Sequence, residues 1–542
     1  MSKDLSRREF LRIAGVTGLG GVLAACAPAA TEAPKAAEPT KAPEATKAPE
    51  PTKAPEPTKE PEKPKEAAVL DYYWVGNADT DQRPLVEEAI NSYIEPLINT
   101  KVIFHIVGWG DWASKAVTGI QAGEKMDIFF TADWWHYMQL ATEGLFRPLN
   151  DDNGEYGNLL EKYGSGILSS LNPAFITGTQ IDGVNYAVPT NKELCVPEGF
   201  IYNVSWAEEI GFTANDAANI KSFADMEPWL EKAKAAYPDE YPYLTDGRVG
   251  FMPWVPGFAS GVGELLVNMK FAPDANGVFD ETIVSPIDTD WAKEHTAVMR
   301  RWYEKGWIHP DSGLDTFNTS EYMNAGKFFI LPQPLKGNNI KAQELVNSSG
   351  NADLKMAEIY GQPKVNITVH SGGSMLAIPM LSEFPVQAMQ YINLMHTDSK
   401  LINMMLFGVE GVHWEFEADG RVNLINSAWY GAHPGAWTLG NTAIQAVTNK
   451  EDPNKNKMLQ EYANDAVNHA SLGFRFRTEP VAAELTAVGA AGSGVQKGLF
   501  TGYVDPAVEL PKYVESLKAA GLDAVKAEIE KQYAAWKAAK KA

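Results

Sequence analysis

The sequence predicts an α/β fold whose strands are mainly parallel and are joined by crossover helices. Short runs of β-branched and aromatic residues alternate with runs whose apolar residues recur at helical spacing. Of the 542 residues, 45% are hydrophobic and 11% aromatic, which is enough for a packed core. Strand, helix and strand in this order favour crossover connections between parallel strands.

The elements follow in order after residue 68. Strands are expected at 69–75, 102–107 and 127–131, with helices at 85–93, 111–122 and 133–144 between and after them. Asp133 is placed to cap the last helix and Gly144 to end it. In parallel sheets the loops at the carboxyl ends of strands form the binding crevice. Here those loops carry Asn77, Trp109 and Trp134.

The N-terminus reads as an export and anchoring signal over residues 1–25. Arg7 and Arg8 precede an apolar stretch at 13–25 that is too short to span a membrane. The paired arginines resemble a bacterial twin-arginine signal, and Leu-Ala-Ala-Cys at 23–26 resembles a lipobox, which would make Cys26 the lipid-modified mature N-terminus. The alternative is a plain secretory signal with Cys26 near its cleavage site.

Residues 26–66 are predicted to be a tether. A Thr-Lys-Ala-Pro-Glu unit recurs every six residues, and the segment holds 10 of the 34 prolines but almost nothing to bury. Proline at this density favours extended polyproline II, which reaches ~3.1 Å per residue.

Composition excludes several classes of protein. The formal net charge of -22 repels phosphate backbones, so nucleic-acid binding is not expected. Nine dispersed histidines show no zinc-binding spacing, and no motif indicates a cofactor, so neither is expected. If Cys26 carries lipid, Cys195 is the only other cysteine, no intramolecular disulfide forms, and Cys195 is expected to be a buried apolar residue.

A series of short motifs in a fixed order resembles the sugar-type extracellular solute-binding proteins of ABC importers. The resemblance covers nearly all of residues 69–540, and the later motifs are similar to a lipoprotein subgroup of that family. It rests on Asp-Ile-Phe-Phe at 127–130, Glu-Gly-Leu-Phe-Arg-Pro-Leu at 143–149, Tyr-Ala-Val-Pro at 186–189, Gly-Phe-Ile-Tyr-Asn at 199–203, Gly-Phe at 211–212, Met-Asn-Ala-Gly-Lys-Phe-Phe at 323–329, Tyr-Ile-Asn-Leu-Met at 391–395, Phe-Gly-Val-Glu-Gly-Val-His-Trp at 407–414 and a helix pair at 513–536.

The resemblance implies a two-lobed periplasmic-binding-protein-like fold of type II, in which each lobe is a mainly parallel sheet flanked by helices. Lobe 1 would hold residues 67–189 with 328–382, and lobe 2 would hold 190–327 with 383–542. Prolines 189, 332 and 379 lie near the expected hinge crossings. The implied protein is not an enzyme. It is a monomer, anchored by lipid to the outer face of the cytoplasmic membrane, that delivers a sugar or oligosaccharide to an ABC permease and its ATPase subunits.

A sugar site needs flat aromatic platforms and polar groups that bond hydroxyls. Many of the 15 tryptophans are expected to be core residues, and the candidates are those on loops. Asn191, Lys192 and Glu193 follow a predicted strand at the expected interlobe crossing. The full set of candidate ligand-binding residues is Trp74, Asn77, Trp109, Asp133, Trp134, Asn191, Lys192, Glu193, Trp254, Trp414 and Trp437.

Two alternatives to sugar transport stay open from the sequence. One is a binding protein for another solute, such as a peptide or a polyol. The other is a secreted carbohydrate-active enzyme or glycan adhesin. A glycoside hydrolase needs two carboxylates at a fixed separation, for which Glu193, Glu410 and Glu415 are candidates.

Overall fold

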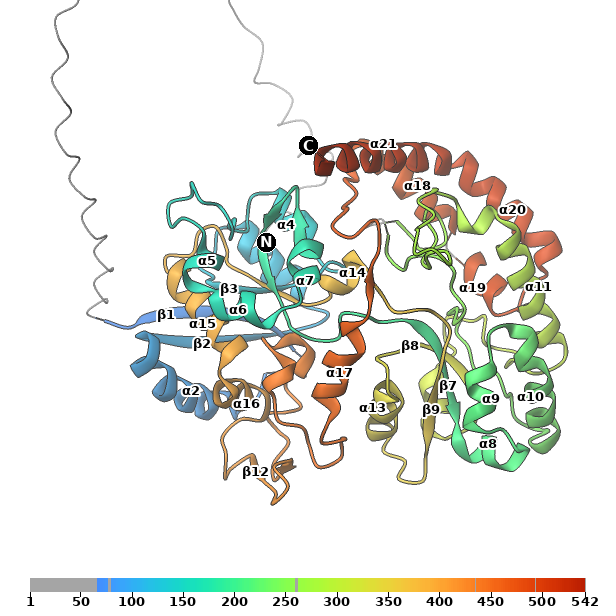
Figure 1. The fold of residues 1–542 in the computed structure, drawn as a ribbon, viewed down its shortest axis with the longest axis horizontal. Coiled ribbons are helices and arrows are strands. Elements are labelled where there is room, and N and C mark those ends of the chain that lie inside the picture. The colour runs from blue at the N-terminus through green and yellow to red at the C-terminus, as the bar shows by residue number, and fades with distance from the viewer. Residues whose placement is uncertain (1–65, 77–78, 259–261, 434, 493, 542) are drawn as a thin grey trace, which may run out of the picture. The chain divides into compact units, whose positions relative to one another are not determined.

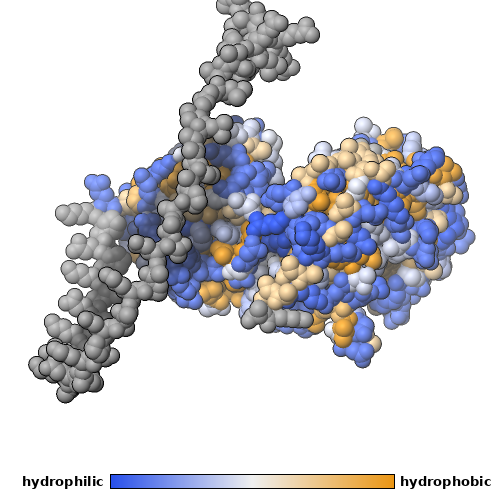
Figure 2. All heavy atoms as spheres, turned by 90° about the horizontal axis from the view of Figure 1, so that it is seen from above, coloured by the Kyte–Doolittle hydropathy of each residue, from blue (hydrophilic) through white to orange (hydrophobic). Residues whose placement is uncertain are grey.

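The computed structural model describes residues 66–76, 79–258, 262–433, 435–492 and 494–541. The predicted signal with Arg7, Arg8 and Cys26, the tether up to residue 65, and Asn77 lie outside the described residues. Within the part that is described, no helix is both long and apolar enough to cross a membrane. On the face shown in Figure 2, hydrophilic residues predominate and hydrophobic residues gather in separate patches.

A five-stranded sheet forms one centre of the fold (Figure 1). β3 and β11 are fully buried, and β1 pairs with β2 in parallel over nine residues and with β3 in parallel. β11 is antiparallel to β3 and to β6. The predicted strands and their parallel pairing are therefore confirmed. The order is β2 (Thr100–Gly108), β1 (Ala68–Gly76), β3 (Ile128–Thr131), β11 (Met375–Ala377) and β6 (Ala187–Pro189).

Helices from two distant parts of the sequence pack into the core of this sheet. α16 is buried from Leu401 to Phe407, as expected of a helix that is apolar on all sides. The helices are α2 (Arg83–Ile98), η1 (Ala113–Val117), α3 (Thr118–Gln121), α4 (Tyr137–Thr142), α5 (Leu159–Tyr163), α6 (Ser165–Ser170), α7 (Pro173–Thr179), α15 (Pro385–Thr397) and α16 (Ser399–Phe407).

A two-stranded hairpin, β4 (Gln180–Ile181) and β5 (Val184–Asn185), follows α7. Its turn residues Asp182 and Gly183 have φ values of 52° and 84°. Two consecutive positive φ angles are typical of the tight turn that matches the twist of a hairpin, and Asp-Gly is a preferred pair for it.

The second sheet has three strands in the order β8 (Ile330–Pro334), β7 (Glu198–Asn203) and β9 (Met356–Tyr360). All its pairings are antiparallel, whereas a mainly parallel sheet was expected here. The helices of this region are α8 (Val204–Ile210), α9 (Ala214–Asn219), α10 (Phe223–Ala236), α11 (Asp290–Glu304), α12 (Thr319–Asn324) and α13 (Ile340–Ser349). The predicted short helix before a returning strand corresponds to α12 and β8.

Strand pairing and packing differ from the expected lobe boundaries. β8 and β9 were expected in lobe 1 but hydrogen-bond to β7, because their edges complete its ladder on both sides. α15 and α16 were expected in lobe 2 but pack into the core of the first sheet, because their apolar faces are buried there. Pro332 lies inside β8 rather than at a crossing.

The C-terminal helices form a third core with residues 249–292. α20 and α21 are the predicted helix pair, with Gly521 between them at a φ of 106°. Val525, Ile529 and Tyr533 of α21 are buried in this core. The helices are α18 (Ala482–Gly492), α19 (Val495–Phe500), α20 (Pro506–Ala519) and α21 (Leu522–Lys541).

Three segments connect the regions of the two large sheets, at 190–197, 361–374 and 464–473. Two of them pair with each other through the short parallel strands β10 (Val365–Asn366) and β14 (Val467–Asn468). The remaining elements are α14 (Thr368–Ser371), α17 (Lys455–Asn464), β12 (Trp414–Phe416), β13 (Val422–Leu424), η2 (Pro286–Asp288), η3 (Ala436–Thr438), η4 (Thr442–Ile444) and η5 (Glu479–Val481).

Candidate functional site

Four tryptophans gather at the carboxyl edge of the first sheet. Trp109 follows β2, Trp134 and Trp135 follow β3, and Trp437 comes from η3. The ring of Trp109 stacks on the other three, with centroid distances of 6.2, 5.2 and 6.2 Å. Trp134 and Trp135 stack at 5.7 Å, and Trp134 is 50% exposed. The edge of this sheet therefore presents an aromatic surface, here called the tryptophan cluster.

Two cavities adjoin the tryptophan cluster from different sides. One has a volume of about 960 Å³ and is lined by Trp134 and Trp135 together with Gly257, Val262 and Glu264, which come from the third core and its loops. The other has a volume of about 650 Å³ and is lined by Trp437, Glu193 and Lys336. The centroids of Trp134 and Trp437 are 6.3 Å apart. The first cavity thus joins two indoles of the cluster to residues of the third core, and the second joins Trp437 to charged groups on either side of it in the sequence.

Asp133 does not cap a helix, contrary to the prediction. α4 begins at Tyr137, and its N-cap residue is His136. The carboxylate of Asp133 instead receives hydrogen bonds from both terminal nitrogens of Arg475, and only 1% of its side chain is exposed. Its backbone N–H donates to the carbonyl oxygen of Gly372 at 2.8 Å.

Position 372 must be glycine, because any side chain there would collide with the carboxylate of Asp133. A Cβ at this position would lie 2.1 Å from Oδ2 of Asp133. The adjacent carbonyl oxygen of Gly373 accepts a 2.9 Å hydrogen bond from Nε1 of Trp134. The crossing segment at 361–374 therefore holds the loop that carries the exposed tryptophan.

The predicted crossing residues Asn191, Lys192 and Glu193 form a group of largely buried polar side chains. Nδ2 of Asn191 donates to the carbonyl oxygen of Ser170 and to Oδ1 of Asn441, both at 2.9 Å, so this amide is structural. Nζ of Lys192 lies 3.0 Å from Oε1 of Glu193. Glu193 also lies 3.6 Å from Nζ of Lys336, which reaches it from the segment after β8.

Burial opposes the ionisation of Glu193, but the charges of Lys192 and Lys336 outweigh it and hold its pKa well below the usual value. The carboxylate is therefore charged at neutral pH. A carboxylate held in this state does not fit the general acid of a glycoside hydrolase, whose pKa is raised.

Comparison with known proteins gives the family. A model described as a bacterial extracellular solute-binding protein matches residues 94–408, more than half of the chain. This chain belongs to the bacterial extracellular solute-binding proteins. A second model, a domain of unknown function (DUF3502), matches residues 470–538. The family is extracellular, and this solute-binding protein is accordingly an exported protein.

Relatives of known description agree with that assignment. The chain is 28% identical over 473 residues to a carbohydrate ABC transporter substrate-binding protein of Streptococcus pneumoniae, covering 86% of this chain and 90% of the relative. Its fold resembles the crystal structure of an N-glycan transport solute-binding protein, NgtS, of the same species, with a TM-score of 0.73, 24% identity, and coverage of 86% and 98%. The structure of NgtS in complex with Man5GlcNAc gives 0.63 at 22% identity with the same coverage.

Three predicted platforms of the solute-binding protein are core residues instead. Trp74 is 0% exposed, because β1 is an interior strand of the sheet, and its ring stacks on His433 at 4.8 Å. Trp414 is 3% exposed and donates from Nε1 to the carbonyl oxygen of Gly408. Trp254 is 6% exposed and packs against Trp291 within the third core.

Two residues of this candidate site were not predicted from the sequence. Trp135 was passed over although it directly follows Trp134 on a strand-end loop. Arg475 was missed although Phe-Arg-Phe-Arg at 474–477 alternates apolar and charged residues, a pattern that places them on opposite faces of an extended segment.

Cys195 is buried with a free thiol, as predicted, and burial raises its pKa to about 11. Among the described residues, no group of histidines, cysteines and carboxylates is arranged to hold a metal ion. The tryptophan cluster offers aromatic stacking, and the charged and amide groups that line the two cavities offer hydrogen bonds.

Proposed function

We propose that this solute-binding protein captures an oligosaccharide beside the tryptophan cluster and delivers it to an ABC permease whose ATPase subunits drive import. The observation that carries the proposal is the cluster itself. Four stacked indoles at a strand edge, one of them half exposed, adjoin two cavities.

The chemistry of a sugar matches these surroundings. Sugar rings present apolar C–H faces that pack on aromatic rings, and their hydroxyls bond charged groups and amides. The 650 Å³ cavity is lined by the amides Asn347, Asn449 and Asn456 as well as by Lys336 and Glu193. Both cavities have the size of typical small-ligand sites, roughly 300–1,000 Å³. Two of them side by side favour a chain of several sugar units over a single one.

The relatives support the same class of solute. One is described as a carbohydrate transporter's binding protein, and another is described in complex with the glycan Man5GlcNAc. Transport rather than catalysis is also what these descriptions name, and we propose that this chain carries out no bond chemistry on its solute.

We propose a division into lobes that follows the sheets and cores. Lobe 1 comprises residues 66–189 with 375–463, and lobe 2 comprises 198–360 with 474–541. The three crossing segments between them form the hinge. A solute that contacts Trp134 on lobe 1 and Glu264 on lobe 2 favours closure, since it binds the closed state better than the open one.

We propose further that the protein acts as a monomer on the outer face of the cytoplasmic membrane. Lipid on Cys26 would anchor it, and the proline-rich segment at 26–66 would hold the lobes away from the membrane surface.

Titration calorimetry with neutral oligosaccharides, amino acids and peptides tests the proposal. We expect heat of binding for at least one glycan, and a rise in Tm on its addition. Binding of peptides or amino acids with no response to any glycan would contradict it. Small-angle scattering with the bound glycan should show compaction, which an adhesin that does not close would lack. Cleavage of the glycan by the purified protein would instead support an enzyme.

A further inference from the structure

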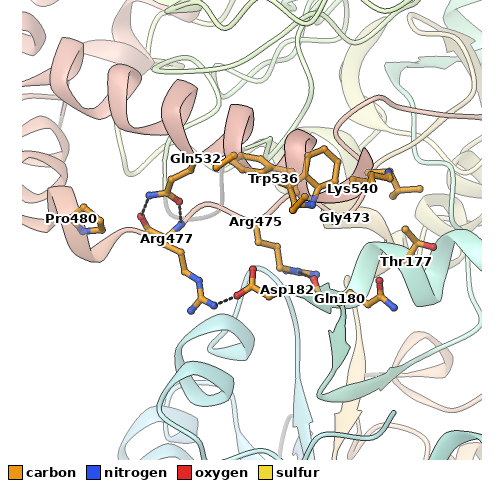
Figure 3. A pocket seen from close by; sticks show the side chains of 15 residues that line it. Thr177, Gln180, Asp182, Gly473, Arg475, Arg477, Pro480, Gln532, Trp536 and Lys540 are labelled. Carbon is orange, nitrogen blue, oxygen red and sulfur yellow. Dashed lines mark hydrogen bonds and ion pairs between the residues drawn. The ribbon is translucent and has the colours of Figure 1, made fainter. Parts of the chain in front are cut away.

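In the C-terminal segment that begins at residue 470, apolar and charged side chains alternate and point in opposite directions. Phe474 and Phe476 are buried in the third core, which the C-terminal helices complete. Arg475 and Arg477, the residues between and after them, reach the opposite way to the hairpin region of the first lobe. Figure 3 shows both arginines pointing from this segment toward Gln180 and Asp182.

Arg475 is a buried arginine, and all three of its guanidinium nitrogens donate hydrogen bonds. Its Nε donates to the carbonyl oxygen of Gln180 at 2.9 Å, and Nη2 donates to the carbonyl oxygen of Gly178 at 2.7 Å. Both terminal nitrogens also bond the carboxylate of Asp133, and its guanidinium lies over the ring of Tyr137 at 5.1 Å. The side chain is 4% exposed. This planar set of contacts requires a guanidinium, which a lysine cannot replace.

The two hydrogen bonds from Arg475 to Asp133, here called the clamp, fix the residue that precedes the exposed Trp134. Trp134 is the next residue, and its loop has two further attachments, to the carbonyl oxygens of Gly372 and Gly373. The same C-terminal segment also lines the 960 Å³ cavity through Phe476, Arg477, Thr478 and Glu479. On its other side, Arg475 borders a separate cavity of about 770 Å³ below α21 (Figure 3).

We propose that the C-terminal domain at 470–538 is a working part of the solute site, in which Arg475 is a positioning residue that fixes Asp133 and thereby the ring of Trp134. The inference rests on the proposed capture of a glycan at the tryptophan cluster. It gives the C-terminal domain a role in solute binding in addition to its packing role in the third core.

The test compares the single variant Arg475→Lys with the double variant Asp133→Asn/Arg475→Met. The lysine variant keeps the charge but loses the bidentate clamp. The double variant removes both charges together, so that no uncompensated charge is left buried and the fold is retained. We expect both to bind the glycan about tenfold more weakly, because an ordered platform becomes mobile and must be ordered on binding. Arg300→Met is the matched control, since Arg300 also holds two carbonyl oxygens and a carboxylate, but on α11.

A second readout does not depend on the glycan. In protein labelled with fluorotryptophan, the ¹⁹F resonance assigned through Trp134→Phe should broaden or shift in both clamp variants and stay unchanged in Arg300→Met. If the folded clamp variants bind the glycan as tightly as the parent protein and keep that resonance, the inference is wrong. If the parent protein binds no glycan while the resonance responds to the clamp variants, the proposed function fails and the positioning role stands.

Discussion

Nε1 of Trp134 donates a 2.9 Å hydrogen bond to the carbonyl oxygen of Gly373, which ties the exposed tryptophan of the first lobe to a segment that crosses between the sheets. An indole with one face in solvent normally samples several orientations. Here the ring is fixed before solute arrives, and little rotamer entropy remains to be lost on binding.

Replacing Trp134 with alanine should weaken glycan binding about tenfold or more, through loss of the stacking face. The free energy of unfolding should fall by only about 1 kcal/mol, because the ring is half exposed and makes one hydrogen bond to the backbone. Calorimetry measures the first effect and urea denaturation the second. Tyr503→Ala, which removes another exposed aromatic, is the control and should leave affinity unchanged. Unaltered affinity in the Trp134 variant would contradict the placement of the site.

Glu193→Gln should destabilise the protein at pH 7 by about 3 kcal/mol, since it leaves the buried Lys192 without its carboxylate partner and Lys336 with Glu344 alone. The pKa of Glu193 is below its ordinary value of 4.5 in the folded protein. Its contribution to stability is therefore present above pH 4.5 and is lost as the pH falls further. Urea denaturation between pH 7 and pH 3 should show the difference from the parent protein narrowing below pH 4.5. Glu208 is exposed, and Glu208→Gln serves as the control. If the difference in stability between Glu193→Gln and the parent protein does not change with pH, the ion pairs of Glu193 are not its cause.

Glu198→Gln should stabilise the protein at pH 8, whereas Glu193→Gln should destabilise it at pH 7. Burial raises the pKa of Glu198 to about 7, with a further contribution from Glu264 and an opposing one from Arg248. Between pH 4.5 and 7 the folded state binds more protons than the unfolded chain, so stability falls as the pH rises through this window. The glutamine variant should have the higher Tm at pH 8, by an amount that disappears near pH 4. Calorimetric scans across this range check it, with Glu88→Gln on α2 as the control, and an equal Tm at pH 8 would refute it.

Cys26→Ser should release the protein from the membrane into the soluble fraction, because lipid attachment requires the thiol. Fractionation of cells followed by immunoblotting measures the shift. The matched variant Cys195→Ser changes the buried thiol and should leave the protein with the membranes. Retention of the Cys26 variant would show that some other contact holds the protein there.

Sequence patterns predicted β1, β2 and β3 of the first sheet well because these three strands follow one another in the sequence. The parallel strands from 69 to 131, the loop tryptophans 109 and 134 and the final helix pair all follow from periodicity within a short window. Trp74 was misassigned for a physical reason: it stands two residues before a strand end, and that strand is interior because β3, from a later part of the chain, pairs with the edge that β2 leaves free.

The lobe boundaries and Arg475 depend on contacts that no local pattern records. β8 and β9 join β7 across more than 100 residues of sequence, and Arg475 meets Asp133 across 342. An arginine between two phenylalanines predicts an extended segment with two faces, but not which acid the arginine will find. The second sheet was expected to be mainly parallel because the family resemblance implied a mainly parallel sheet in each lobe, whereas its pairings are antiparallel.

The pairing of β10 with β14 would limit how the two proposed lobes move relative to each other. Two of the three crossing segments, 361–374 and 464–473, must bend together, since bending one alone would break the strand pairing between Val365 and Val467. The motion that remains is a rotation of one proposed lobe relative to the other about a single axis, and the paired strands resist twisting about any other axis. In the closure that we propose, tryptophans and carboxylates that approach along one path would meet in the same register each time, so the spacing between the lobes would select the length of a glycan in addition to its contacts.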